Sequence, residues 1–263
     1  MPFNQKIIYY IPSLPLLLII LVVIISISML GLWLVRRFFS HEILKPHNDV
    51  AGFMFATLGV VYAVLLAFVV IIVWENYERA NADVSAEANC MMMMYRGSDI
   101  FHDPEKKHLH SLLKDYANVN TEKEWKALAR AESSTEIDKI LLDIWKVYLL
   151  YTPRTEAQKI IYAESVSTLH QFSSLRRELV HHAKEGLPGL LWLVLIAGGM
   201  ITIAFTFFFG TENIHAQHIM TALLAALIGL MLFIILSLDF PFTGDFSISP
   251  EPFKQLLIRW QQP

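Results

Sequence analysis

Cysteine and charged residues are scarce in this sequence of 263 residues. Cys90 is the only cysteine, which excludes an intrachain disulfide. Charged residues make up 17% of the chain, where about a quarter is usual, and hydrophobic residues make up 55%. The net charge of −3 lacks the basic excess that is typical of proteins that bind nucleic acid or anionic membrane surfaces. The composition is too apolar for an ordinary soluble domain.

Charge is missing altogether from four long apolar blocks. Each block has about 20 residues or more, which is enough for a helix to cross a bilayer, so the sequence predicts four transmembrane helices. Proton-coupled pumps and transporters usually need charged groups at membrane depth, and this absence disfavours them. No small-x-small cleavage site precedes Arg36-Arg37, so we expect the first block to be retained as a helix. The four blocks are Leu14–Val35, Val50–Trp74, Gly189–Gly210 and Ile219–Leu238.

A polar stretch of about 110 residues, from Glu75 to Glu185, separates the two pairs of blocks and has little strand character. Capping and breaking signals divide it into amphipathic helices, of which the longest runs from Thr155 to Lys184. The signals are Asp103-Pro104, Ser133-Ser134-Thr135-Glu136, Thr152-Pro153 and Gly186-Leu187-Pro188.

The chain is therefore predicted to be an all-α membrane protein in four parts. Membrane helices 1 and 2 occupy residues 14–74, and a helical soluble domain occupies residues 75–187, continuing helix 2 and leading into helix 3. Membrane helices 3 and 4 occupy residues 188–238, and a tail at residues 239–263 docks on the soluble domain.

Basic residues near the membrane ends give the orientation. The basic residues of the short loops are nearly equal in number on the two sides of the membrane. The soluble stretch adds several more on the side of the two termini. We therefore expect a bacterial inner-membrane protein whose termini and soluble domain are cytoplasmic. The added basic residues are Arg79, Arg176, Arg177 and Lys184.

The segment from Val50 to Arg96 is the most unusual part of the chain. Its first 25 residues, Val50–Trp74, carry no charge, and it then continues as a polar, helix-forming stretch without Pro or Gly. At 1.5 Å per residue this predicts one helix roughly 70 Å long, about twice the thickness of the membrane core. Such a helix can couple a membrane pathway to a soluble domain.

Two stripes lie along this predicted helix. Small residues share one face of the membrane part. One interpretation is that they permit close helix packing in lipid, and the other is that one edge of this face lines a pore. Beyond the membrane, charged residues repeat every four positions, as on a solvated or salt-bridged helix face, or as in a vestibule wall that concentrates ions. The small residues are Gly52, Ala56, Gly59, Ala63 and Ala67, and the charged ones are Glu75, Arg79, Asp83 and Glu87.

No motif for catalysis or for a cofactor is present in the sequence. Its ten histidines form only isolated close pairs, such as His215-x-x-His218, with no third ligand nearby and no HExxH motif. No spacing pairs a nucleophile with a base, and no phosphate-binding glycine loop occurs. We therefore expect no enzyme activity, metal or cofactor.

The tail after the fourth block, LDFPFTGDFSISPEPF, combines turn formers with carboxylates. One interpretation is a structured turn that docks the tail, and the other is a site for a hard cation. The residues concerned are Asp239, Pro241, Phe242, Gly244 and Asp245, with Pro250 and Glu251 further on.

Several of these motifs together resemble a bacterial and plant family described as bestrophin-like. The motifs are HNDVAGFMFATLGVVYAVLLAFVVIIVWENYERA, the Glu87-Ala88 pair, GLPGLLW and the tail motif, and the resemblance extends from about Leu14 to Leu257. A more distant similarity to true bestrophins rests on Trp74-Glu75-Asn76-Tyr77-Glu78 and on Pro241-Phe242 with Gly244.

Bestrophins are pentameric anion channels, with some bacterial members passing cations, and their helical domain is cytosolic. The resemblance implies the same fold and a pore whose apolar neck lies on the second helix. Counting back from Trp74 places the neck at Ala56, Val60 and Val64. These side chains are smaller than those of bestrophin necks, which implies a wider constriction or different packing. Only Asp245 directly follows the P-F-G-like motif, which argues against calcium gating.

The sequence and the resemblance together favour a homo-oligomeric channel in the lipid bilayer. It would pass inorganic ions, and chloride and other anions in preference to cations, through a central pore lined by the second helix. The resemblance alone implies five subunits. The alternative hypothesis is a non-conducting scaffold or sensor that recruits a partner through residues 75–185. A membrane-embedded enzyme is a third hypothesis, for which no polar cluster is evident.

Overall fold

The computed structural model describes residues 1–39 and 44–261, and within these ranges every regular element is a helix. Four helices are long and apolar enough to cross a membrane, by length and composition. The predicted all-α membrane fold is therefore confirmed. Residues 40–43, within the first predicted part, and residues 262–263, at the end of the predicted tail, lie outside the described residues.

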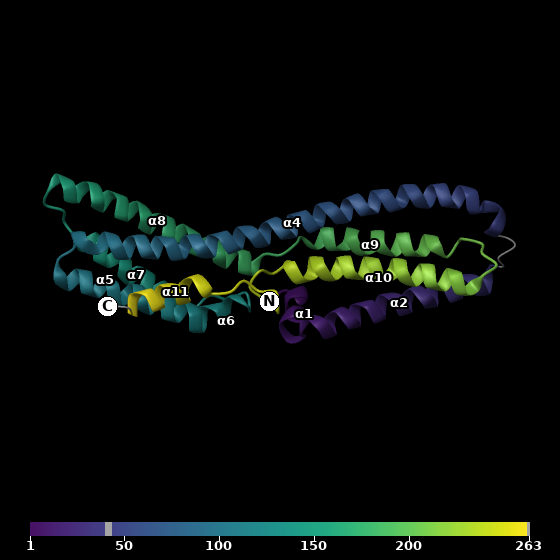
Figure 1. Cartoon of the computed structure of the whole chain (residues 1–263), viewed down its shortest axis with the longest axis horizontal. Helices are drawn as coiled ribbons and strands as arrows, with labels where there is room; N and C mark the ends of the chain where they lie inside the picture. Colours follow the sequence, from purple (N-terminus) through teal and green to yellow (C-terminus); the bar gives the residue numbers. More distant parts are fainter. Residues whose placement is uncertain (40–43, 262–263) are drawn as a thin grey trace. The chain divides into compact units, whose positions relative to one another are not determined.

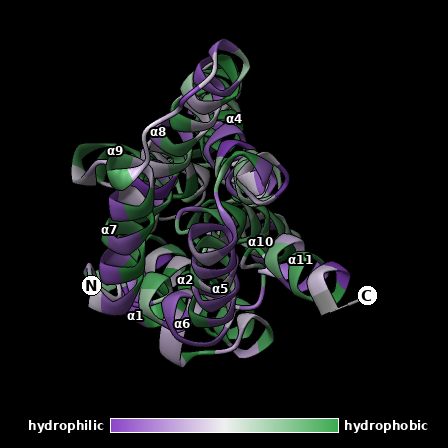
Figure 2. Cartoon of the chain, turned by 90° about the vertical axis from the view of Figure 1, so that its left-hand side faces the viewer, coloured by the Kyte–Doolittle hydropathy of each residue, from purple (hydrophilic) through white to green (hydrophobic). Residues whose placement is uncertain are grey.

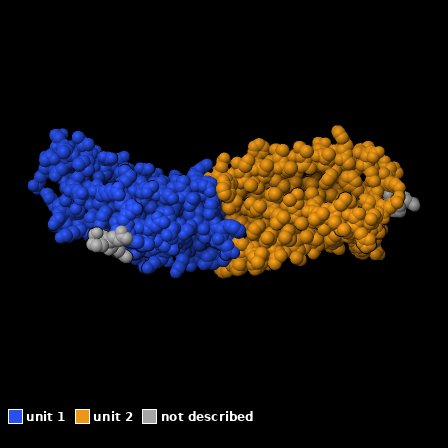
Figure 3. All heavy atoms as spheres, in the orientation of Figure 1, with its two compact units in different colours: residues 1–9, 76–186, 240–263 blue, residues 10–75, 187–239 orange. Residues whose placement is uncertain are grey.

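The chain folds into two compact units, which Figure 3 colours separately. Unit 1 contains residues 1–9, 76–186 and 240–263, and unit 2 contains residues 10–75 and 187–239. Helix α4, Asn48–Gly97, contributes residues to both units. The predicted long helix over residues 50–96 is thus present as one element.

Unit 2 is a bundle of apolar helices: α2 (Ser13–Phe38), the first part of α4, α9 (Gly189–Thr206) and α10 (Ile214–Leu238). Helix α2 packs against α9 and α10, as Figure 1 shows. Helix α10 begins five residues before the predicted apolar block, because the side chain of Asn213 caps it by accepting from the Ala216 N–H at 3.0 Å. Helix α9 ends at Thr206, four residues before the end of its predicted block.

Unit 2 is apolar on its outside as well as in its core. Leu32, Leu195 and Ala225 are buried between the helices, while Val22 and Leu223 are largely exposed. Helices α4 and α9 approach closely at Gly198, where an added Cβ would lie 2.7 Å from the ring of Tyr62. A bundle that is apolar on all sides is typical of a membrane environment.

Unit 1 combines the rest of α4 with α1 (Phe3–Tyr10), α5 (Asp103–Val119), α7 (Thr135–Leu150), α8 (Glu156–Lys184) and α11 (Glu251–Gln261). Helices α7 and α11 pack against α5. Their hydrophobic faces form the core, and Figure 2 shows hydrophilic and hydrophobic residues on the same helices of this unit.

The capping signals in the sequence mark the helix starts of unit 1 correctly. Helix α5 begins at Asp103 with Pro104 in its first turn. The Ser134 hydroxyl caps α7 by accepting from the Glu136 N–H at 3.3 Å. Thr155 and Gln158 form a capping box at the start of α8.

One irregularity was not predicted. Helix α5 continues into a π-helical turn, η3 (Asn120–Glu124), and then into α6 (Trp125–Leu128). A π-turn contains about one residue more than an α-helical turn, and such turns occur frequently at functional sites. The 3₁₀ turns η1 (Lys45–His47) and η2 (Ser98–Ile100) flank α4.

The N-terminal helix and the tail pack together in unit 1. The fully buried Gln5 amide donates to Thr243 Oγ1 at 3.0 Å and to the Ala183 carbonyl at 3.3 Å. Next to Thr243, Gly244 adopts a φ of +82°, a conformation that other residues rarely adopt, and an added Cβ would collide with Cγ2 of Ile8. Glycine is therefore required at this turn.

We expect Gly244→Ala to destabilise unit 1 by about 2 kcal/mol, because the left-handed conformation costs about 1 kcal/mol or more and the collision with Ile8 adds to it. The measurement is the midpoint of thermal unfolding of the purified protein in detergent. Gly189→Ala is the control, since nothing lies within 4 Å of the added Cβ. Equal midpoints for the two variants would contradict this account of the turn.

Candidate functional site

The residues predicted to form the pore neck lie on an exposed face of α4. Val60 is 65% exposed and Val64 is 49% exposed, and Ala56 belongs to the same exposed class. Four residues advance about 40° beyond one helical turn, so the three positions span about 80° of the helix surface. This apolar face is available to lipid, to a water-filled path or to a neighbouring subunit.

Three of the other small residues of α4 line a groove within unit 2. Gly59, Ala63 and Ala67 line an apolar groove of about 590 Å³ together with side chains of α9 and α10. Among the residues that the structure describes, nothing lies within 4 Å of a Cβ added at Gly59 or Gly52. Within this chain the small-residue stripe therefore borders open space and makes no close helix contact at these two glycines.

The predicted charge stripe does not form a single solvent-facing surface. Glu75 and Arg79 are exposed, Asp83 is half-buried and bonds to His182 Nε2 at 3.2 Å, and Glu87 is fully buried. The cause is helical geometry, because three four-residue steps rotate the side chain by about 120°. This rotation carries Glu87 from the exposed face of α4 to the buried one. A vestibule role stays a prediction for Glu75 and Arg79.

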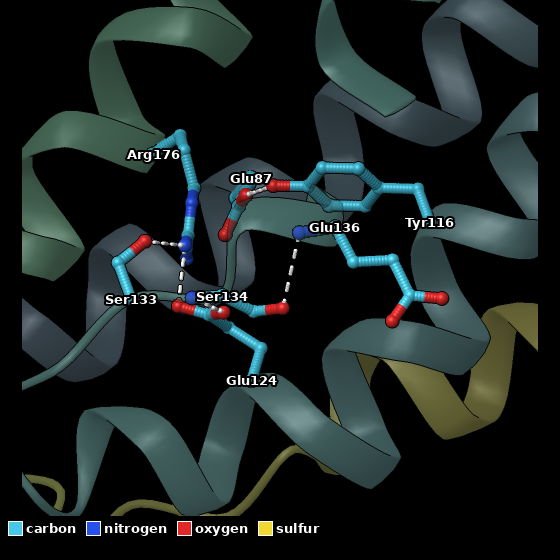
Figure 4. Close-up of polar contacts among 7 residues, drawn as sticks. All are labelled: Glu87, Tyr116, Glu124, Ser133, Ser134, Glu136 and Arg176. Atoms are coloured by element: carbon cyan, nitrogen blue, oxygen red, sulfur yellow. Dashed lines mark hydrogen bonds and ion pairs between the residues drawn. The ribbon is translucent and has the colours of Figure 1, made fainter. Parts of the chain in front are cut away.

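A buried polar cluster surrounds Glu87 in unit 1 (Figure 4). The Tyr116 hydroxyl donates a short hydrogen bond to Glu87 Oε1. Nearby, Arg176 donates to Glu124 Oε1 in a short ion pair and to the Ser133 hydroxyl at 2.9 Å. Glu87 and Glu124 have no exposed surface, and Arg176 is 3% exposed. Four elements thus meet in one buried polar layer.

The π-turn places Glu124 in this layer. Tyr116, Asn120 and Glu124 follow one another at four-residue spacing along α5 and η3, and all three are fully buried. The second oxygen of Glu124 accepts from the Ser134 N–H at 2.7 Å, which ties η3 to the start of α7. The i, i+4 spacing was visible in the sequence, but nothing in the sequence distinguishes a buried Arg176 from an exposed one.

The two carboxylates of the cluster differ in their electrostatic surroundings. Glu124 has a guanidinium partner, whereas Glu87 accepts a hydrogen bond from the neutral Tyr116 hydroxyl, and Oε2 of Glu87 has no partner among the described residues. Burial raises the pKa of Glu87 to about 7, against the opposing effects of the Arg176 charge and the Tyr116 hydrogen bond. The same burial raises the pKa of the Tyr116 hydroxyl well above its ordinary value.

The predicted tail residues serve packing on each unit. In unit 2, the buried Asp239 carboxylate accepts from the Leu187 N–H at 2.6 Å and from the Trp192 indole at 3.3 Å. Burial raises the pKa of Asp239. In unit 1, Pro241 is buried, and the ring of Phe242 packs edge-to-face on Trp125 at 5.5 Å.

The carboxylate of Asp245 lies at the exposed end of this turn. Across residues 1–39 and 44–261, no group of three or more His, Cys, Asp or Glu side chains is placed to hold a metal ion. The cation-site interpretation of the tail therefore gains no support from the arrangement of the described side chains.

We expect Arg176→Met to cost about 3–5 kcal/mol of folding free energy, because it leaves Glu124 buried without its counter-charge. The double variant Glu124→Gln/Arg176→Met should recover most of this loss, since no unpaired charge remains. Thermal unfolding in detergent measures both. Lys159→Met is the control on the same helix, since its ion pair with Glu156 is exposed and contributes little. A double variant as unstable as Arg176→Met would contradict this interpretation.

Comparison with known proteins assigns the fold. Two crystal structures of single-residue variants of a bacterial bestrophin homolog from Klebsiella pneumoniae match with TM-scores of 0.71 and 0.67, at 15% and 13% identity. The first match covers 95% of this chain and 97% of that chain, and the second covers 92% and 96%. A structure described only as a membrane protein variant matches with a TM-score of 0.69 at 14% identity, covering 92% of this chain and 96% of that chain.

These identities are low and establish the fold alone. None of the curated proteins matches the chain. The model of the Bestrophin-like domain matches residues 22–253, which is most of the chain and includes the α4 face, the buried cluster and the tail motif. The chain belongs to the bestrophin-like family.

Proposed function

We propose that this chain is the subunit of a homo-oligomeric channel that passes ions, anions first, along a central path lined by α4. The observation that supports this most directly is the outward apolar face of α4, where Ala56, Val60 and Val64 are exposed in the single chain. Membership of the bestrophin-like family favours conduction through that face. The number of five subunits rests on the resemblance to bestrophins.

The mechanism is passive flux through an apolar neck. Rings of Val60 and Val64 around a common axis would form a constriction that gates by losing or admitting water, without a charged gate. The membrane part of α4, Val50–Trp74, holds no titratable carboxylate or amine, so the proposed path needs no proton coupling. Glu75 and Arg79 are both exposed beyond the membrane part of α4, and they would set the ion concentration at the mouth of the proposed path.

The proposal includes an orientation in the membrane. Basic residues next to the apolar segments favour an orientation in which unit 1 and both termini are cytoplasmic, and we propose a bacterial inner membrane as the location. Of the basic residues that the soluble stretch adds, Arg79, Arg177 and Lys184 are exposed, whereas Arg176 is buried. Accessibility of single cysteines introduced at exposed positions of unit 1, measured in intact cells, tests this orientation.

We expect Val60→Trp and Val64→Trp to abolish or strongly reduce ion flux, because a ring of indoles fills an apolar neck of small side chains. Flux is measured in proteoliposomes and by single-channel recording in planar bilayers. Val61→Trp is a matched control, since Val61 is 64% exposed against 65% for Val60 but lies about 100° further around the helix. All variants are compared at equal oligomer content by size-exclusion chromatography with light scattering.

Unchanged conductance and selectivity in both neck variants would show that α4 does not line the path at these positions. A wild-type protein that forms an intact oligomer without flux, and whose unit 1 retains a partner protein, would instead favour the scaffold hypothesis. The two outcomes are separable because the first concerns the neck alone and the second concerns conduction itself.

A further inference from the structure

We propose that Glu87 is a proton-binding site of unit 1, and that its proton controls how α4 packs against α5 and α8. The inference concerns this unit alone and does not require that the protein conducts ions. It rests on the composition and bonding of the buried cluster around Glu87.

The acidic groups of the buried cluster outnumber its cation. The buried cluster contains two carboxylates, Glu87 and Glu124, and one guanidinium, Arg176. Arg176 bonds Glu124, while the hydrogen bond at Glu87 comes from the neutral hydroxyl of Tyr116. A fully buried carboxylate without a bonded counter-charge strongly favours its neutral form. Glu87 is therefore the member of the cluster that holds a proton.

The titratable and charged groups that face Glu87 come from every neighbouring element and act in opposite directions. From α4 come Asp83 and the thiol of Cys90, from α5 comes Tyr116, from η3 comes Glu124, and from α8 comes Arg176. Asp83 is itself bonded to His182 of α8. Of the charged groups, Arg176 favours the ionised carboxylate, whereas Asp83 and Glu124 disfavour it. Burial outweighs these opposing effects and raises the pKa of Glu87 to about 7, which lies in the neutral range.

The cluster also has hydrogen-bonding atoms that are free to serve an ionised Glu87. Nε and Nη1 of Arg176, both amide atoms of Asn120 and Oε2 of Glu87 have no partner among the described residues. An ionised Glu87 would accept hydrogen bonds from the free Nε and Nη1 of Arg176, and would in this way compete with Glu124 for the guanidinium. Because Glu124 and Asn120 belong to the π-turn, a shift of Arg176 changes the packing of η3 as well. The cluster thus has two arrangements with different proton counts.

The sign of the pH effect follows from linkage. A glutamate in the unfolded chain has a pKa near 4.5, and the folded state raises it to about 7. Between these values the folded state binds more protons than the unfolded state, so stability falls as pH rises through this window. Glu87→Gln imitates the neutral acid and removes this contribution.

The test uses the full-length protein in detergent between pH 5.5 and 8.5. We expect the wild-type melting midpoint to fall as pH rises, and the protection factors of η3 and the adjoining turn of α5, which correct hydrogen exchange for its intrinsic rate at each pH, to fall as well. In Glu87→Gln both trends flatten, and the infrared carbonyl band of a buried carboxylic acid is lost. Glu78→Gln is the matched control on the same helix, since Glu78 is exposed, and it should keep both the band and the trends.

A pH dependence of melting and exchange in Glu87→Gln equal to that of the wild type overturns the proposal. If Glu87→Gln does not fold, Tyr116→Phe decides instead, because it removes a hydrogen bond that favours the ionised form. The midpoint of the exchange transition should then move to higher pH, and an unmoved midpoint overturns the proposal. Neither result depends on ion flux, so the proposal can fail while the channel function stands.

Discussion

Helix α4 has to satisfy two environments along one unbroken backbone. Over Val50–Trp74 it carries no charge, and its own helical hydrogen bonds satisfy the backbone, as lipid requires. Beyond Trp74 the same helix contributes Ala80, Val84 and Met91 to the core of unit 1. In the apolar part every side chain can face lipid or protein at little cost, whereas in the polar part each position must face solvent or find a partner. The rest of the structure depends on which residues α4 turns inward in its second part.

The pitch of the helix decides that choice. A four-residue repeat drifts by about 40° at each step, so a stripe that begins on the exposed face at Glu75 ends in the core at Glu87. The core then has to supply a hydrogen-bond partner for the buried carboxyl group. It does so with a tyrosine hydroxyl from α5, and it places a second carboxylate and its guanidinium nearby. The buried cluster is therefore a consequence of the register of α4 as much as of the sequence of α5.

Most of the fold could be predicted because its determinants are local. Uncharged blocks specify membrane helices, and caps such as Thr155 with Gln158 specify where helices start. The cluster could not be predicted in this way, since burial of Arg176 depends on which helices pack against α8. The π-turn at Asn120–Glu124 is also non-local, because the buried ion pair with Arg176 and the hydrogen bond from the Ser134 N–H accompany it. The face of α4 at Val60 and Val64 was located by resemblance, and its role as a neck stays a prediction.

The cost of burying charge bears on why the cluster exists. Well-packed apolar residues of similar volume usually stabilise a core as well as a buried ion pair does, so stability alone gives little reason to keep Glu124 and Arg176. A third ionisable group, Glu87, adds a further cost whenever it is charged. Packing alone gives little reason to bury a carboxyl group that is hydrogen-bonded to a neutral hydroxyl. The arrangement is better explained if the proton itself matters, since one buried carboxyl group near its titration point changes its charge over a range in which the exposed acids and lysines do not.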